Sequence, residues 1–211
     1  DSVPPIYKWN GNKLNAGSVT TFNEYAIVSE NRLTKVSNFQ NQEVASLFGC
    51  AVLTGFGVIE NNAKARIGES IVVFGSGGVG LNMIQAAASS SMHPIIAVDL
   101  HDSRLELAKE CGASHVINSK SQDAKVLIRQ FLEEDELDIF IDNTGQPSII
   151  EMGYSLISQH GRVVLVGVPS KENNINIHSL PLHFGKTIIG SHGGEATPHL
   201  DIPRYQKLIR N

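Results

Sequence analysis

The chain has 211 residues, a formal net charge of −4, 41% hydrophobic and 18% charged residues, as is typical of a globular protein with a buried core. This acidic balance argues against a nucleic-acid partner, which requires clustered lysine and arginine. The two cysteines, Cys50 and Cys111, lack CxxC spacing, which disfavours a disulfide framework and predicts a reducing, cytoplasmic location. We find no run of about 20 consecutive apolar residues and no secretion signal, so no membrane partner is expected.

The first forty residues differ in pattern from the rest of the chain. Residues 18–36 contain two short strand-like pieces joined by the polar turn SENR, without a crossover helix between them. We therefore expect residues 1–40 to be the end of a β-rich domain and the chain to be part of something longer. A helix carrying the small-residue run LTGFG should follow over 42–61.

From Ser70 onward, short apolar runs alternate with longer amphipathic ones. This alternation is typical of successive βαβ units, and near-continuous apolar strands are buried on both faces. The sequence thus predicts an α/β fold, a Rossmann-type doubly wound parallel sheet, over a domain spanning 41–211. The expected strands are 71–74, 94–99, 115–118, 137–142, 161–168 and 186–191, and the expected helices are 78–91, 103–111, 122–133, 147–158 and 202–210, the last with Pro203 in its first turn.

A glycine-rich turn joins the first of these strands to the first helix. Its sequence GSGGVG matches GxGxxG through Gly75, Gly77 and Gly80. The first glycine permits the tight bend, the second lets backbone approach a pyrophosphate, and the third lets the helix pack close to the strand. The diphosphate would rest on the helix amino terminus, where free N–H groups and the helix dipole favour negative charge. The turn predicts a dinucleotide site, and a sheet of this type without a nucleotide is the alternative.

An acidic residue supports the prediction of a dinucleotide site. Asp99 ends the next strand, nineteen residues after Gly80, where this class of site places a carboxylate. The carboxylate can accept hydrogen bonds from the adenosine ribose of NAD, whereas it would repel the 2′-phosphate of NADP. Arg104 is either a contact to the adenosine edge or a solvated helix charge.

The cysteines and histidines give no strong metal signal of their own. On composition, Cys50 is a small buried hydrophobe in an apolar helix, and Cys111 is a packing residue. The eight histidines form no HxxxH or HExxH pair, and His101 is expected at the surface.

Several segments together resemble one known family. They are LFGCAVLTGFG (47–57), GESIVVFGSGGVGLNMIQAA (68–87), AVDLHDSRLELAKECGASHVIN (97–118), IDNTGQ (141–146) and GRVVLVGVP (161–169). The combination resembles the zinc-dependent alcohol dehydrogenases of the medium-chain dehydrogenase/reductase superfamily, and the resemblance runs from about Gly17 to Arg210. It implies a zinc cofactor as well as NAD.

The resemblance also implies roles for individual residues. In that family the cysteine of GCxxxTGxG is a ligand of the catalytic zinc, which assigns Cys50, and the threonine lies near the nicotinamide, which assigns Thr54. The implied cofactor contacts are Gly75, Ser76, Gly77, Gly78, Val79, Gly80, Asp99, Leu100, Arg104, Thr144, Gly145, Val166, Gly167 and Val168. Among them, Val79, Val166 and Val168 would surround the nicotinamide.

Other parts of the family pattern are missing from this sequence. The other catalytic zinc ligands, a cysteine and a GHE histidine, do not occur, nor does the four-cysteine lobe of a structural zinc. Residues 1–40 would be a remnant of a GroES-like catalytic domain. Because a catalytic zinc requires three protein ligands, we expect this chain to be inactive alone.

The sequence is compatible with three functions. The first is an NAD-dependent zinc alcohol dehydrogenase that transfers a hydride between an alcohol or aldehyde and NAD. The second is a polyol, aryl-alcohol or thiol-adduct aldehyde dehydrogenase of the same superfamily, and the third is a catalytically inactive dinucleotide-binding module. A homodimer or homotetramer paired through the edge strand 186–191 is expected, unless a further segment covers that edge.

Overall fold

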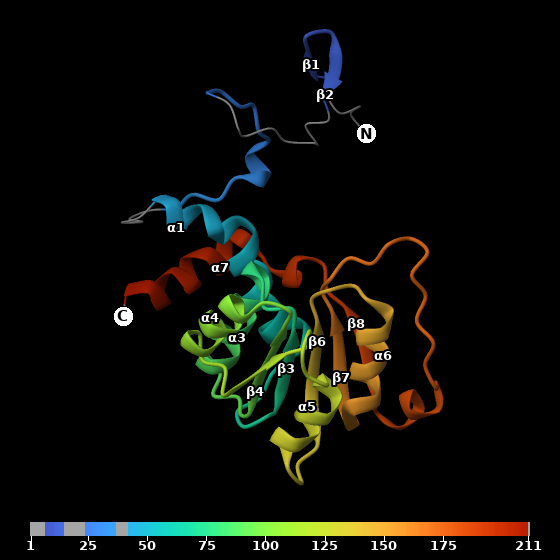
Figure 1. The fold of residues 1–211 in the computed structure, drawn as a ribbon. Coiled ribbons are helices and arrows are strands. Elements are labelled where there is room, and N and C mark those ends of the chain that lie inside the picture. The colour runs from blue at the N-terminus through green and yellow to red at the C-terminus, as the bar shows by residue number, and fades with distance from the viewer. Residues whose placement is uncertain (1–6, 15–23, 37–41, 211) are drawn as a thin grey trace. The chain divides into compact units, whose positions relative to one another are not determined.

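The computed structural model describes residues 7–14, 24–36 and 42–210. The chain forms two compact units, Asp1–Ser37 and Asn38–Asn211. In the first unit, β1 (Tyr7–Trp9) and β2 (Asn12–Leu14) pair as an antiparallel hairpin (Figure 1). Its turn, Asn10 and Gly11, has φ of 48° and 80°, the left-handed geometry that an Asn-Gly hairpin turn uses. The sequence reading had not included this hairpin.

Residues 24–36 correct one expectation. The SENR turn is present as the 3₁₀ helix Glu30–Arg32, but neither 24–29 nor 33–36 contains a strand. Leu33 is extended, with φ −107° and ψ 136°. An extended segment becomes a strand only where a neighbour pairs with its backbone groups. The rest of the first expected piece, 18–23, lies outside the described residues.

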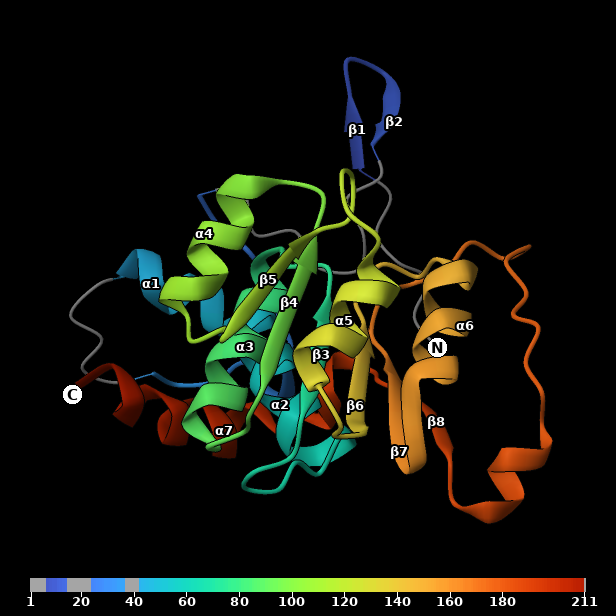
Figure 2. The same cartoon turned by 60° about the horizontal axis from the view of Figure 1, so that its bottom comes forward.

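The second unit contains a six-stranded parallel sheet. Its order is β5-β4-β3-β6-β7-β8, so the predicted doubly wound sheet is confirmed (Figure 2). The strands are β3 (Ile71–Phe74), β4 (Ile95–Asp99), β5 (His115–Asn118), β6 (Leu137–Asp142), β7 (Ile157–Leu165) and β8 (Thr187–Gly190). The connecting helices are α3 (Gly78–Ser89), α4 (Asp102–Glu110), α5 (Ala124–Leu132) and α6 (Pro147–Leu156).

Each face of the sheet has its own hydrophobic core. Side chains alternate along a strand, so Val73 and Val72 of β3 belong to opposite cores. Met83 of α3 packs in the first core with side chains of α4, and Ile128 of α5 packs in the second with side chains of α6. Because both faces are covered, β3 and β4 are buried along their whole length, which explains their uninterrupted apolar sequences.

The predicted helix over 42–61 is confirmed and has two irregular segments. It runs through α1 (Gln42–Leu47), a π-helical segment (Phe48–Val52), α2 (Leu53–Gly57) and a second π-helical segment (Val58–Asn62). π-helical turns are rare and often occur at functional sites. The periodicity of the sequence does not reveal them, because it predicts only that a helix is present.

The length and composition of Gln42–Asn62 would also allow it to cross a membrane. Length and composition alone do not show a membrane span, and the expectation of no membrane partner stays a prediction. A core helix of a globular protein passes the same test, and this one buries Val58 and Ile59 against the first core. It approaches α3 closely, since a methyl group at Gly55 would lie 2.9 Å from the Asn82 backbone.

The chain after β6 departs from the predicted boundaries. β7 begins at Ile157, where the sequence reading had extended α6, and ends at Leu165 instead of residue 168. It ends there because the Val166 and Gly167 amides both donate to the Asp142 carbonyl, at 2.8 and 3.0 Å, which turns the chain away from the sheet.

The last helix also begins earlier than predicted. α7 spans Pro198–Tyr205 and continues as the 3₁₀ segment Gln206–Arg210. Pro198 occupies the first turn, so Pro203 lies inside the helix and the prediction for Pro203 is wrong. An internal proline removes one helical hydrogen bond.

Candidate functional site

A crevice opens at the carboxyl ends of β3 and β6. These strands are neighbours, but the helices that follow them, α3 and α6, pack on opposite faces of the sheet (Figure 2). Doubly wound sheets bind ligands at this switch point. The cleft measures about 540 Å³ and is lined by Phe74, Gly75, Gly77, Asp99, Leu100, His101, Arg104, Ser119, Asn143, Thr144, Gln146 and Ile149.

The glycine turn is tight on its inner side and open on its outer side. Gly75 has a φ of 100°, and its N–H donates to the Val98 carbonyl at 2.8 Å. A methyl group at Gly80 would collide with the Gly75 carbonyl, so α3 needs glycine there to pack close to the strand. A methyl group at Gly77 would meet nothing within 4 Å. The turn therefore leaves its second glycine free for the close approach of a diphosphate, as predicted.

Asp99 organises the edge of this turn from the end of β4. Its Oδ2 accepts from the Ser76 N–H at 2.8 Å, and its Oδ1 accepts from the amides of Leu100 and His101 at 2.8 and 3.1 Å. Arg104 Nη1 lies 3.5 Å from Oδ1. A carboxylate oxygen accepts about two hydrogen bonds, so Oδ2 retains capacity for one ligand hydroxyl.

Asp142, at the end of β6, also accepts hydrogen bonds from a neighbouring loop. Its side chain is fully buried. Oδ1 accepts from the N–H and hydroxyl of Thr144 at 3.0 and 2.6 Å, and Oδ2 accepts from the Gly145 N–H at 2.9 Å. These bonds hold the loop that forms the other wall of the cleft.

The loop after β7 lies against the loop after β6. A methyl group on Gly145, whose φ is 71°, would lie 2.9 Å from both the Val168 carbonyl and the Pro169 nitrogen. Val79 and Val166 pack against the same core. Val168 is 92% exposed, and the role of these three valines at a nicotinamide stays a prediction.

The cleft contains part of the predicted cofactor set. Gly75, Gly77, Asp99, Leu100, Arg104 and Thr144 line it, whereas Ser76, Gly78, Val79, Gly80, Gly145, Val166, Gly167 and Val168 lie outside the lining. Ser76 is fully buried, and its hydroxyl has no hydrogen-bond partner among the described residues. Its N–H is directed to Asp99, so Ser76 supports the turn from beneath.

Sequence reasoning missed four polar residues of the lining: His101, Ser119, Asn143 and Gln146. The signal that identifies them is their place shortly after the predicted strands 94–99, 115–118 and 137–142, because strand ends of a parallel sheet meet at one edge.

Cys50 and Thr54 lie on the helix Gln42–Asn62 and not in the cleft lining. Cys50 is an exposed free thiol, so the composition-based expectation of a buried residue is wrong. The Thr54 carbonyl contacts the 3₁₀ turn Gly193–Glu195, where a methyl group on Gly194 would lie 2.7 Å away. Cys111 packs against the first core as predicted, and burial raises the pKa of its thiol.

A zinc site is not complete in the part of the chain that the structure describes. No group of three histidine, cysteine or acidic side chains comes together in 7–14, 24–36 or 42–210. A single thiol does not satisfy a tetrahedral zinc ion. The described residues therefore do not fit this metal, although they fit a dinucleotide.

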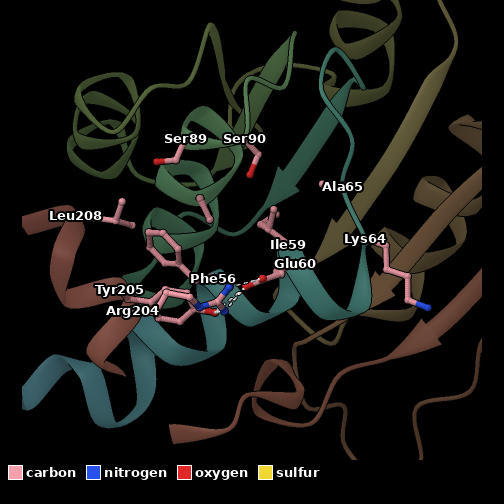
Figure 3. A pocket seen from close by; sticks show the side chains of 11 residues that line it. Phe56, Ile59, Glu60, Lys64, Ala65, Ser89, Ser90, Arg204, Tyr205 and Leu208 are labelled. Atoms are coloured by element: carbon pink, nitrogen blue, oxygen red, sulfur yellow. Dashed lines mark hydrogen bonds and ion pairs between the residues drawn. The ribbon is translucent and has the colours of Figure 1, made fainter. Parts of the chain in front are cut away.

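A second cavity, of about 530 Å³, lies between the helix Gln42–Asn62, the end of α3, and α7 (Figure 3). Inside it, Arg204 donates to both carboxylate oxygens of Glu60 at 2.6 Å, and the Tyr205 hydroxyl donates to the same carboxylate at 3.1 Å. The Arg204 hydrogen bonds lower the pKa of Glu60. The ring of Tyr205 packs on Phe56 at 4.9 Å. These contacts attach α7 to the helix.

The sheet order and the glycine turn define the class of protein: a doubly wound α/β domain of the Rossmann type. Comparison with known families goes further. Residues 78–211 match the family model described as zinc-binding dehydrogenase, and the chain belongs to this family.

Individual relatives agree with this assignment. The chain is 31% identical over 202 residues to an S-(hydroxymethyl)glutathione dehydrogenase of Synechocystis sp., covering 93% of this chain and 54% of that protein. It is 30% identical over 211 residues to alcohol dehydrogenase class-P of Arabidopsis thaliana, covering 98% and 53%. The crystal structure of benzyl alcohol dehydrogenase from Acinetobacter calcoaceticus superposes with a TM-score of 0.85 at 34% identity, covering 92% and 53%. The chain thus spans about half the length of the relatives it matches.

Proposed function

We propose that this chain is the coenzyme-binding part of an NAD-dependent alcohol dehydrogenase. The observation that carries the proposal is Asp99, which holds the glycine turn through Ser76 and keeps one acceptor position free beside the cleft. A ribose hydroxyl satisfies that position, and the diphosphate would lie over Gly77. In the reaction, the alcohol carbon would transfer a hydride to the nicotinamide, and the alcohol oxygen would release a proton.

The same carboxylate favours NAD over NADP. A 2′-phosphate would stand beside Asp99, which is 5% exposed, and two negative charges at such distances repel each other. Arg104 offsets this only in part, because it is already 3.5 Å from Asp99 and half exposed.

The substrate class is proposed from the relatives. Their names include alcohol, benzyl alcohol and S-(hydroxymethyl)glutathione dehydrogenases, so an alcohol or aldehyde is the substrate we infer. An aryl-alcohol, polyol or thiol-adduct aldehyde substrate is the alternative within the family. We propose Cys50 as one zinc ligand, to be joined by ligands from outside the described residues.

Assembly and location are further parts of the proposal. A homodimer or homotetramer would form through β8, whose neighbour in the described sheet is β7 on one side, leaving an edge. The 3₁₀ segment Leu180–Phe184, which precedes β8 in the chain, exposes three large apolar side chains. Sedimentation of the purified chain tests this assembly, and a monomer at high concentration would contradict it.

The two free cysteines support a cytoplasmic location.

The first experiment is a titration of the chain with NADH and NADPH, followed by nicotinamide fluorescence or heat. We expect saturable binding that favours NADH, and loss of that preference in Asp99→Ala. Asp102→Ala is the matched control, because it removes an exposed carboxylate three residues away that lies outside the cleft lining. Equal binding of the two nucleotides by the wild type would contradict the NAD assignment. Binding without any dehydrogenase activity in the full-length protein would favour the inactive module.

A further inference from the structure

Asn143 links the loop after β6 to the glycine turn after β3, and these two segments form opposite walls of the cleft. It follows β6 directly, and its N–H donates to the Phe74 carbonyl at 2.9 Å, continuing the pairing of β6 with β3. Its side-chain Nδ2 donates to the Gly75 carbonyl at 3.1 Å. The residue therefore holds the first position of the glycine turn from a strand 68 residues further along the chain.

This contact fixes the orientation of the Asn143 amide. The Gly75 carbonyl can only accept, so the nitrogen of the amide must face it. The opposite atom, Oδ1, accepts no hydrogen bond within the described residues and is not among their buried unpartnered atoms. Asn143 lines the cleft, so a free, neutral acceptor is available there.

The position of this acceptor relative to Asp99 suggests its ligand. Asp99 ends β4 and Asn143 follows β6, and β3 with its glycine turn lies between these strands. A dinucleotide carries one ribose on each side of its diphosphate. If the diphosphate rests on Gly77 and one ribose is held by Asp99, the second ribose lies on the Asn143 side.

We propose that Asn143 is a recognition residue of this cleft, with Nδ2 holding the Gly75 carbonyl and Oδ1 accepting a hydrogen bond from a hydroxyl of the nicotinamide-side ribose. The inference rests on the proposed dinucleotide function and adds a specific contact to it. A purely structural asparagine would hold the turn and make no distinction between ligands with one ribose and with two.

The test compares ADP, which has one ribose, with ADP-ribose, which has two. Isothermal titration of the wild-type chain should give tighter binding of ADP-ribose by about 3- to 10-fold, the value of one net hydrogen bond. In Asn143→Ala this advantage should disappear, while loss of the Gly75 contact weakens the binding of both ligands alike. The ratio of the two affinities is the readout, because damage to the turn alone weakens both ligands equally and leaves the ratio unchanged.

Asn143→Asp provides the rescue. It keeps an acceptor and loses the donor to Gly75, so both ligands should bind more weakly while the advantage of ADP-ribose persists. Equal wild-type affinities for ADP and ADP-ribose would overturn the inference without any variant, and an unchanged ratio in a folded Asn143→Ala would overturn it as well. Failure of the wild type to bind ADP or NADH at all is a different result, which overturns the proposed function itself.

Discussion

Asp99 and Asp142 occupy equivalent places in the fold yet differ in what surrounds them. Each ends a central strand, and each accepts three hydrogen bonds from the loop that follows or faces it. Asp99 lines the cleft and has Arg104 beside it, whereas Asp142 is fully buried and its side chain accepts hydrogen bonds from Thr144 and Gly145 of the loop that follows it. One carboxylate therefore faces the cleft, and the other holds the loop that forms a wall of the cleft.

The difference lies in what remains free after folding. The Oδ2 atoms of Asp99 and Asp142 each have a single protein donor, but only Asp99 lines the cleft, so only its Oδ2 keeps binding capacity there. Asp142 is shielded by Thr144 and Gly145, and removing its oxygens would leave buried donors without partners. An acidic residue at a strand end indicates function only where its oxygens remain accessible.

The largest effect is expected for Asp142→Ala. It leaves three donors without a partner, of which the Gly145 N–H is buried and the two of Thr144 are half-buried, so the free energy of unfolding should fall by about 2–4 kcal/mol. Urea unfolding followed by circular dichroism measures this. Asp142→Asn keeps one acceptor and should lose roughly half as much. A loss below that of Asp99→Ala would show that the contrast between the two carboxylates is wrong.

An added methyl group should lower the stability of the chain at one end of the glycine turn and leave it almost unchanged at the other. Gly80→Ala places a methyl group against the Gly75 carbonyl and should destabilise the chain by roughly 1–3 kcal/mol. Gly77→Ala meets open space at an ordinary φ of −74°, so stability should change by less than about 0.5 kcal/mol. NADH affinity should fall in Gly77→Ala, because the methyl group occupies the space that the diphosphate needs. If the NADH affinity of Gly77→Ala is unchanged, the diphosphate does not lie over Gly77.

Asp99→Ala should have a smaller effect on stability than on binding. Water in the cleft can replace the carboxylate as acceptor for part of the loop, so the free energy of unfolding should fall by only about 1–2 kcal/mol. Thermal unfolding with and without NADH separates the effects: the stabilisation that NADH gives the wild type should be reduced in the variant. If NADH stabilises the variant against thermal unfolding as much as it stabilises the wild type, Asp99 does not contribute to NADH binding.

A third carboxylate, Glu69, allows a test by pH at the opposite end of the sheet. Arg162 Nη1 and Nη2 donate to it at 3.1 and 2.5 Å, and Arg162 Nε also donates to the Ala63 carbonyl. Burial acts to raise the pKa of Glu69, but hydrogen bonds from Arg162 and the Arg66 amide outweigh it, so the pKa is lowered from 4.5.

Because the folded-state pKa is lowered, this carboxylate stabilises the native state above pH 4.5 and loses that contribution as the pH falls through the lowered pKa. Glu69→Gln should therefore cost about 1 kcal/mol near neutral pH and progressively less in acid. Urea titrations of both proteins across this range check the sign. A difference that grows on acidification would contradict it.

Local patterns predicted most of the second unit. Strand and helix periods, together with the GxGxxG spacing, located β3, α3 and β4 to within two residues, because each feature depends on neighbours close in sequence. The prediction failed where distant contacts set the boundary. β7 ends early because its following amides bond to the Asp142 carbonyl, and the hairpin of β1 and β2 was overlooked although Asn10-Gly11 indicates it.

The candidate site divides in the same way. Gly75, Gly77 and Asp99 follow from one short stretch of sequence, since a turn, a helix start and the next strand end are linked by chain geometry. Asn143 belongs to the site because β6 pairs with β3 and brings its amide to the Gly75 carbonyl. The exposure of Cys50 and the burial of Asp142 likewise depend on packing between elements far apart in the chain. Short-range spacing specifies residue types and turns, whereas hydrogen-bond partners and accessibility arise when the sheet assembles.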